Sequence, residues 1–142
     1  MGWNKTERIP ENEIREKITS VSVEFAKNFG EYLASGDKND SEALTTTQLR
    51  KFFGEVKRQQ MNGYEQSKFI MLKPKLAYAV GRAKSEKKGS HKIEDFYNVM
   101  ADAIDKVVKS PDQTKAFKNF IDIFEAIVAY HKVAENNKQK TY

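Results

Sequence analysis

The chain has 142 residues, the usual size of a single domain, and its 39% hydrophobic and 32% charged residues exclude a disordered composition. It contains no cysteine, which excludes disulfides, thiolate zinc sites and cysteine nucleophiles and fits a reducing cytoplasm. The formal net charge is +5, and no uncharged run exceeds seven residues, far fewer than the ~20 apolar residues that a membrane-spanning helix needs.

The N-terminal segment lacks the apolar centre of a secretory signal, which favours a soluble cytoplasmic protein with no membrane partner. From residue 11 to residue 35, apolar side chains recur every three or four positions, a spacing that predicts one helix with a single buried face. Gly36 and the polar residues 37–41 would end this helix. Its buried face would consist of Ile14, Ile18, Val21, Phe25, Phe29 and Leu33.

A second helix is predicted from Thr46 to about Gln60. Thr45 and Gln48 have the spacing of a capping box, in which two side chains satisfy the free N–H groups at a helix start. An apolar stripe at helical spacing follows, and it is expected to be buried. The stripe consists of Leu49, Phe52, Phe53 and Val56.

A third helical stretch covers residues 64–85, but it is interrupted at Lys73 and Pro74. A proline either opens a new helix at its first position or kinks a continuous one, and the residues leave both alternatives open. The polar segment 83–92 that follows predicts a frayed helix end and a loop.

A fourth helix is predicted from Ile93 to about Lys109, because apolar residues stay in helical register along it. Directly after it, Ser110, Pro111 and Gln113 supply a cap, a first-position proline and a capping-box partner. These three residues predict the start of a fifth helix.

The fifth helix, over residues 111–136, is the most apolar segment of the chain. Apolar side chains cover most of its circumference, so it is expected at the centre of a bundle or within an interface. The last seven residues, NNKQKTY, predict a frayed tail. A narrow polar stripe on this helix consists of Lys118, Asp122, Glu125, Ala129 and Lys132.

No segment alternates apolar and polar residues over the length of a strand, and no two-residue hairpin turn occurs. The predicted fold is therefore all-α. We expect a single domain over residues 1–142, built as a compact bundle of about five helices.

Few side chains favour catalysis or metal binding. His91 and His131 stand forty residues apart without carboxylates at metal-ligand spacing, so they are expected in a loop and on a helix flank. Asp122 and Glu125 lie on the polar stripe beside lysines, which favours ion pairs over a catalytic pair. With no phosphate-binding loop and no nucleophile motif, we predict a protein that is not an enzyme and that holds no metal or cofactor.

The strongest signal is a basic segment over residues 45–92. It contains twelve Lys and Arg residues and three Glu residues, a net charge of +9, whereas the other 94 residues carry 13 basic and 17 acidic side chains, a net charge of −4. Charge segregated in this way predicts attraction to a polyanion. The first functional hypothesis is therefore a protein that binds a nucleic-acid backbone.

Helical spacing gathers several of these cations into stripes. Lys75, Tyr78 and Arg82 fall on one face after Pro74, an arrangement suited to phosphates with a base or sugar stacked on the ring. On the second helix two pairs each share a stripe, Arg50 with Lys57 and Lys51 with Arg58.

Three blocks of this chain are LTTTQLRKFFGEVK (44–57), LKPKLAYAVGRAK (72–84) and FKNFIDIFEAIVAYHK (117–132), about a third of its length. In order and spacing they resemble the small helical subunit of the Csm complex, the type III-A CRISPR–Cas interference machine. The resemblance implies a non-catalytic subunit whose copies stack into an inner filament and line the groove that holds the guide–target duplex. On matching positions it implies RNA-binding roles for Arg50, Lys57, Lys73, Lys75 and Arg82, with Lys51 and Arg58 as additional contacts.

The charge predicts a nucleic-acid partner, and the resemblance implies the individual partners: guide RNA, target RNA, other subunits of the complex and further copies of the chain. A subunit that must accept any guide should contact the backbone and leave sequence to base pairing. The Phe- and Ile-rich helices also leave room for a homodimer of the isolated protein, by helix exchange across residues 36–44.

Two alternatives remain at this point. A helix-turn-helix DNA-binding protein would pair residues 44–60 with residues 64–82, but residues 74–82 offer mainly small apolar groups where base-directed polar groups are usual. A protein-interaction bundle would leave the +9 segment without a role.

Overall fold

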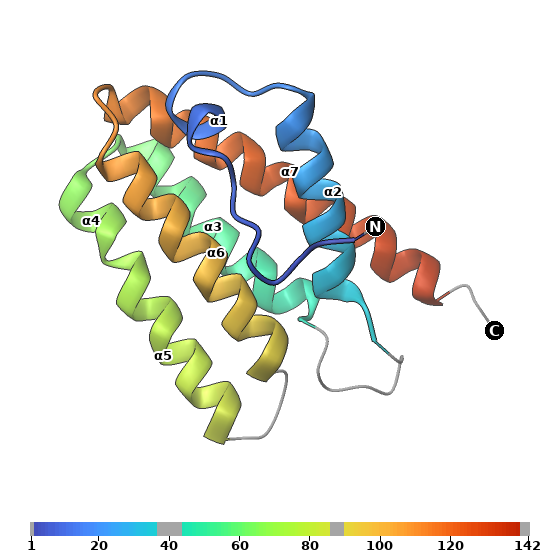
Figure 1. Ribbon diagram of the computed structural model, residues 1–142. Coiled ribbons are helices and arrows are strands. Elements are labelled where there is room, and N and C mark those ends of the chain that lie inside the picture. The colour runs from blue at the N-terminus through green and yellow to red at the C-terminus, as the bar shows by residue number, and fades with distance from the viewer. Residues whose placement is uncertain (1, 37–43, 86–89, 140–142) are drawn as a thin grey trace.

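The computed structural model describes residues 2–36, 44–85 and 90–139, and every regular element among them is a helix (Figure 1). The expected all-α fold is confirmed. The helices are α1 (Glu11–Arg15), α2 (Ser20–Ala34), α3 (Thr46–Asn62), α4 (Gln66–Ile70), α5 (Leu72–Ser85), α6 (Ser90–Val108) and α7 (Gln113–Gln139). Expectations about the exchange linker (37–43), part of the polar loop (86–89) and the last tail residues (140–142) lie outside the described residues.

The predicted single helix over residues 11–35 is wrong, because the chain breaks between α1 and α2. Thr19 has extended backbone, and its side-chain oxygen accepts a hydrogen bond from the Val21 N–H at the start of α2. The break rotates the two halves of the expected stripe relative to each other. As a result Val21, predicted to be buried, is 51% exposed, whereas Ile14 and Phe25 are buried.

The carboxylate of Glu13 stabilises the break between α1 and α2. It is buried, and its Oε1 accepts hydrogen bonds from the backbone N–H groups of Thr19 at 2.8 Å and Ser22 at 3.1 Å and from both hydroxyl groups. Burial opposes ionisation, but the hydrogen bonds from Ser22 and Thr19 outweigh it and hold the pKa of Glu13 below its ordinary value. The ionised side chain therefore adds a second acceptor to the Thr19 cap at the start of α2.

Helix α3 forms as predicted. Thr45 and Gln48 make the complete capping box, and the helix ends at Gly63, whose φ of 95° lies in the region that favours glycine. Leu49 and Val56 are fully buried. The two phenylalanines between them are half-buried and pack against the core.

Pro74 neither opens a helix at its first position nor kinks a continuous one. Helix α4 ends at Ile70, a turn follows at Met71, and α5 begins at Leu72. Pro74 is thus the third residue of α5, where a backbone N–H has no partner within the helix in any case. The first bond across the turn, from the Lys75 N–H to the Met71 carbonyl, spans 3.4 Å.

Helix α6 begins at Ser90, so the predicted loop over residues 83–92 is wrong at its end. His91, expected in a loop, is an exposed helical residue. Lys92 is buried, and its Nζ donates to the Tyr32 carbonyl at 3.1 Å and to Ser35 Oγ at 2.7 Å. The ammonium also lies 3.8 Å from the centroid of the Tyr32 ring. The buried ammonium of Lys92 therefore caps the C-terminal end of α2, where a positive charge is favourable.

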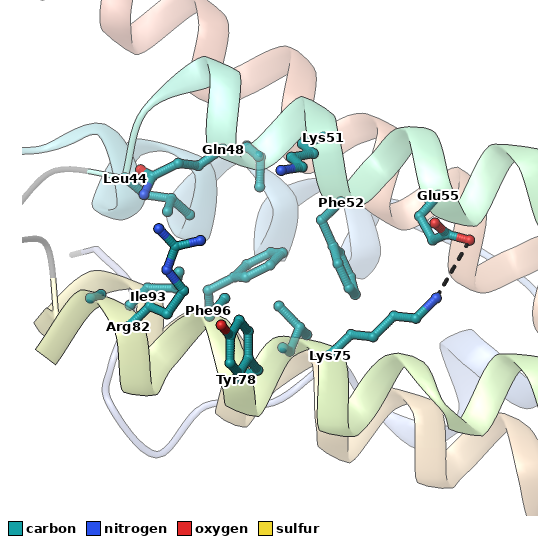
Figure 2. A pocket seen from close by; sticks show the side chains of 14 residues that line it. Leu44, Gln48, Lys51, Phe52, Glu55, Lys75, Tyr78, Arg82, Ile93 and Phe96 are labelled. Carbon is teal, nitrogen blue, oxygen red and sulfur yellow. Dashed lines mark ion pairs between the residues drawn. The ribbon is translucent and has the colours of Figure 1, made fainter. Parts of the chain in front are cut away.

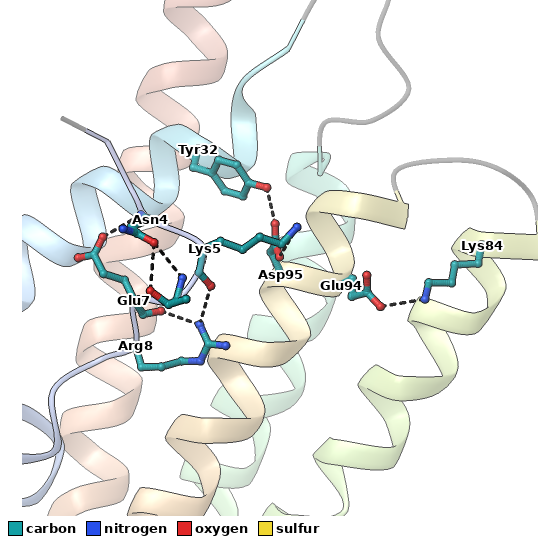
Figure 3. A network of polar contacts seen from close by, with 9 residues as sticks. Asn4, Lys5, Glu7, Arg8, Tyr32, Lys84, Glu94 and Asp95 are labelled. Atoms are coloured by element: carbon teal, nitrogen blue, oxygen red, sulfur yellow. Dashed lines mark hydrogen bonds and ion pairs between the residues drawn. The ribbon is translucent and has the colours of Figure 1, made fainter.

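The N-terminal segment lies across α2 and α6 (Figure 3). Trp3 packs on Phe29 and Tyr32, with ring centroids 4.9 Å and 4.7 Å away. Lys5 reaches Asp95 of α6 at 3.9 Å, and the Tyr32 hydroxyl donates to the same carboxylate. These contacts pack the N-terminal segment against α2 and α6.

Helix α7 is longer than predicted and begins later. Ser110 is not its cap, because the Ser110 hydroxyl donates to the Lys106 carbonyl at 2.7 Å. Asp112 takes that role, and its Oδ1 accepts from the Lys115 N–H at 3.1 Å. The helix continues to Gln139, so the first four residues of the expected frayed tail are helical.

The expected central position of α7 is confirmed, since the helix packs against α1, α2, α3 and α6. Phe124 is buried within a cluster of aromatic rings contributed by three helices. Lys118 pairs with Asp122 at 3.1 Å on the exposed stripe, as the spacing predicted. The rings around Phe124 belong to Phe52, Phe53, Phe96 and Phe120.

Helices α2 and α7 lie close together at Gly30. A Cβ atom on Gly30 would lie 2.8 Å from the Ile127 carbonyl oxygen and 2.9 Å from the His131 nitrogen. His131, expected on a helix flank, is fully buried beside this contact, and its Nε2–H donates to the Leu44 carbonyl at 2.6 Å. The histidine therefore links α7 to the residue that leads into α3.

Two glycine substitutions should have opposite effects. Gly30→Ala places a methyl group against backbone atoms and should cost about 2–3 kcal/mol of unfolding free energy. Gly81→Ala, in α5 with nothing within 4 Å of its Cβ, should gain about 0.5–1 kcal/mol from helix propensity. Urea unfolding of both variants checks this, and a Gly30→Ala variant as stable as wild type would contradict the close packing.

Glu13→Gln should make stability less dependent on pH. Because the folded-state pKa of Glu13 is lowered, its stabilisation is present above the ordinary carboxyl pKa and is lost as pH falls through the folded-state value. We expect a loss of about 1–2 kcal/mol at pH 7 that shrinks on acidification. Glu24→Gln, on the exposed face of α2, is the control, and a deficit that does not change between pH 7 and pH 3 would refute the assignment.

Candidate nucleic-acid interface

A groove with a volume of about 470 Å³ runs between α3 and α5 (Figure 2). It exists because the two helices pack on different partners, α3 on α7 and α5 on α6. Ile93 and Phe96 of α6 line it between the two walls. The groove therefore combines an apolar floor with walls formed by the flanks of two helices.

The wall formed by α3 presents Gln48, Lys51 and Glu55, which follow at steps of three and four residues. At 100° per residue, Arg50 and Lys57 lie on the opposite flank of α3. Lys57 there approaches the Phe53 ring, with Nζ 6.0 Å from its centroid.

The wall formed by α5 presents Lys75, Tyr78 and Arg82, the face expected from their spacing. Tyr78 is 69% exposed, an unusual position for a large aromatic ring, and it stands between the two cations. Its exposed ring offers a surface for stacking, and Lys75 beside it reaches across the groove toward α3.

Glu55 joins the two walls. Its Oε1 accepts a hydrogen bond from Arg58 Nη1 at 2.9 Å within α3, and its Oε2 lies 3.9 Å from Lys75 Nζ on α5. Arg58, which points outward from α3, is connected to the groove through this carboxylate.

Lys73 lies on the flank of α5 that faces α6. Its Nζ donates to Asp105 Oδ1 at 2.8 Å, and the lysine side chain is only 29% exposed. Lys84 and Glu94 form a similar bridge between the same helices at 2.8 Å. Lys73 therefore contacts α6 and is separate from the groove.

The structure brings three of the seven predicted RNA-binding residues together in the groove, namely Lys51, Lys75 and Arg82. Sequence reasoning missed Glu55 as part of this site. Its spacing to Arg58 was visible in the sequence, but its approach to Lys75 depends on how two separate helices are placed.

Within residues 2–36, 44–85 and 90–139, no group of three His, Asp or Glu side chains is arranged to hold a metal ion. None of the helices in those ranges combines the length and the apolar character that crossing a membrane requires.

Comparison with known proteins identifies a family. The model of the family described as Csm2 Type III-A matches residues 15–137, a range that includes every residue of the groove. No curated protein and no solved structure matches the chain.

Proposed function

The chain belongs to the Csm2 type III-A family, the small subunits of the Csm complex, and on this premise we propose that it binds the backbones of guide RNA and target RNA. The observation that carries the proposal is the row of Lys51, Lys75 and Arg82 along one groove, with exposed Tyr78 among them. Exposed cations on two helices suit a chain of phosphates, and the ring offers stacking to a base or sugar.

The binding is independent of sequence. Lysine and arginine contacts to phosphate carry no base information, and the groove walls offer few amide groups aimed at base edges. Sequence selection is left to pairing between guide and target. Several copies of the subunit, stacked along the RNA in the cytoplasm beside the other Csm subunits, would add their weak contacts together.

RNA binding should depend strongly on salt and weakly on sequence. If four to six cations touch phosphates, the slope of log K against log[salt] should be about −3 to −4 on single-stranded RNA, at ~0.7 per contact. Lys75→Ala combined with Arg82→Ala should reduce the slope by about 1.4 and leave melting nearly unchanged, since both side chains are exposed. Fluorescence anisotropy at several salt concentrations measures the slope.

The matched control removes two exposed cations elsewhere, Lys27 on α2 and Lys132 on α7. This variant has the same net charge, and its RNA affinity should stay close to that of wild type. Arg50→Ala with Lys57→Ala tests the opposite flank of α3, where weaker binding is expected as well. Equal affinity of all variants, or a preference for duplex DNA over RNA at matched salt, would contradict the proposal.

We also propose that the subunit does not cleave RNA. Metal-dependent phosphodiester cleavage needs several carboxylates that converge on one or two ions, whereas Glu55 in the groove contacts two cations. Incubation of highly purified protein with labelled RNA and Mg²⁺ or Mn²⁺ should leave the RNA intact. Cleavage that disappears in an Asp122→Asn, Glu125→Gln double variant would refute this.

A further inference from the structure

Glu55 is the acidic side chain among the described residues that line the α3–α5 groove (Figure 2). It is 27% exposed and lies in the wall between Lys51 and Arg58, opposite Lys75. A negative charge at this position works against the attraction of a polyanion such as RNA.

The contacts of Glu55 go beyond a local helix pair. Its bond to Arg58, at 2.9 Å, is of the i,i+3 type that is common on exposed helices and stabilises them little. The second contact, with Lys75 at 3.9 Å, comes from another helix across the groove. One carboxylate thus lies between Arg58, on the outer side of α3, and Lys75 of α5, where a phosphate that bridges the two cations would lie.

We infer that Glu55 is an internal competitor for the RNA phosphate and sets the strength of backbone binding in the groove. This inference rests on the proposed RNA binding. A phosphate that engages Arg58 and Lys75 has to displace the carboxylate, and the displaced charge remains close enough to repel it. Binding in the groove is therefore an exchange of anions rather than the occupation of free cations.

The contacts of Glu55 affect the groove both before RNA binds and in the complex with RNA. Before RNA arrives, Glu55 holds the two long side chains near their binding positions, which lowers the entropy lost on binding. The same contacts reduce the binding free energy that each bound phosphate contributes. Each subunit then binds weakly, and tight binding requires several subunits on one RNA.

The test compares wild type with Glu55→Gln, which keeps the shape of the side chain and removes its charge. We expect about three- to tenfold tighter binding to single-stranded RNA at low salt. The salt slope should become steeper by about 0.7, because Arg58, which is paired with Glu55 in the wild type, becomes a further cation available to phosphates. Glu55→Asp keeps the charge and should bind close to wild type.

Glu65→Gln provides the matched control. Glu65 also pairs with a lysine three residues away, Lys68 at 3.2 Å, and it lies outside the groove, so the change in net charge is identical. The affinity of the Glu65→Gln variant for single-stranded RNA should differ from that of wild type by less than about twofold. In a background that lacks Arg58 and Lys75, Glu55→Gln should no longer tighten binding, because the released cations are absent.

The outcomes separate the inference from the proposed function. Tighter binding and a steeper slope for Glu55→Gln alone support the competitor role. Equal effects of Glu55→Gln and Glu65→Gln, or weaker binding by Glu55→Gln with an unchanged melting temperature, overturn it while RNA binding by the subunit stands. Absence of salt-dependent RNA binding in every variant overturns both.

Discussion

The apolar surface of α7 has to be covered on nearly all sides, and the positions of the other helices follow from how they cover it. Helix α2 reaches α7 closely enough only because Gly30 carries no side chain, and α3 contacts it through phenylalanines around Phe124. Helix α6 covers a further side, and α5 packs on α6 instead of on α7. The separation of α3 from α5, and with it the groove, is a result of this core arrangement.

Charge pairing divides the basic segment into cations that hold helices together and cations that face solvent. Lys92 is buried at the end of α2, and Lys73 bridges α5 to α6 through Asp105. Lys51 and Lys75 remain exposed along the groove. The excess of positive charge in the sequence is therefore larger than the charge available to an RNA, since part of it stabilises the bundle.

The capping box of α3 was predicted from local spacing, the equally local Ser110 cap was wrong by two residues, and long-range contacts explain the other failures. The capping box of Thr45 needs only residues three positions apart, so its spacing sufficed. The start of α2 is capped by Thr19 and also depends on Glu13, six residues earlier. An unbroken apolar period in the sequence concealed this break between α1 and α2. Lys92 was expected in a loop and His131 on a helix flank, but both are buried against partners that are distant in sequence, Tyr32 and Leu44. The groove face of α5 was predictable from periodicity, whereas the position of its opposite wall was not.

The floor of the groove has a consequence for how this surface can change through mutation. Ile93 and Phe96 lie between the two walls, so the volume of these side chains helps to set how far the cations of α3 stand from those of α5. Phosphates along an RNA strand have a fixed repeat, to which that separation has to correspond. Natural variation in apolar side chains beneath the groove would therefore alter the fit to RNA without the gain or loss of a single charge, and related sequences with identical basic residues need not bind RNA equally well.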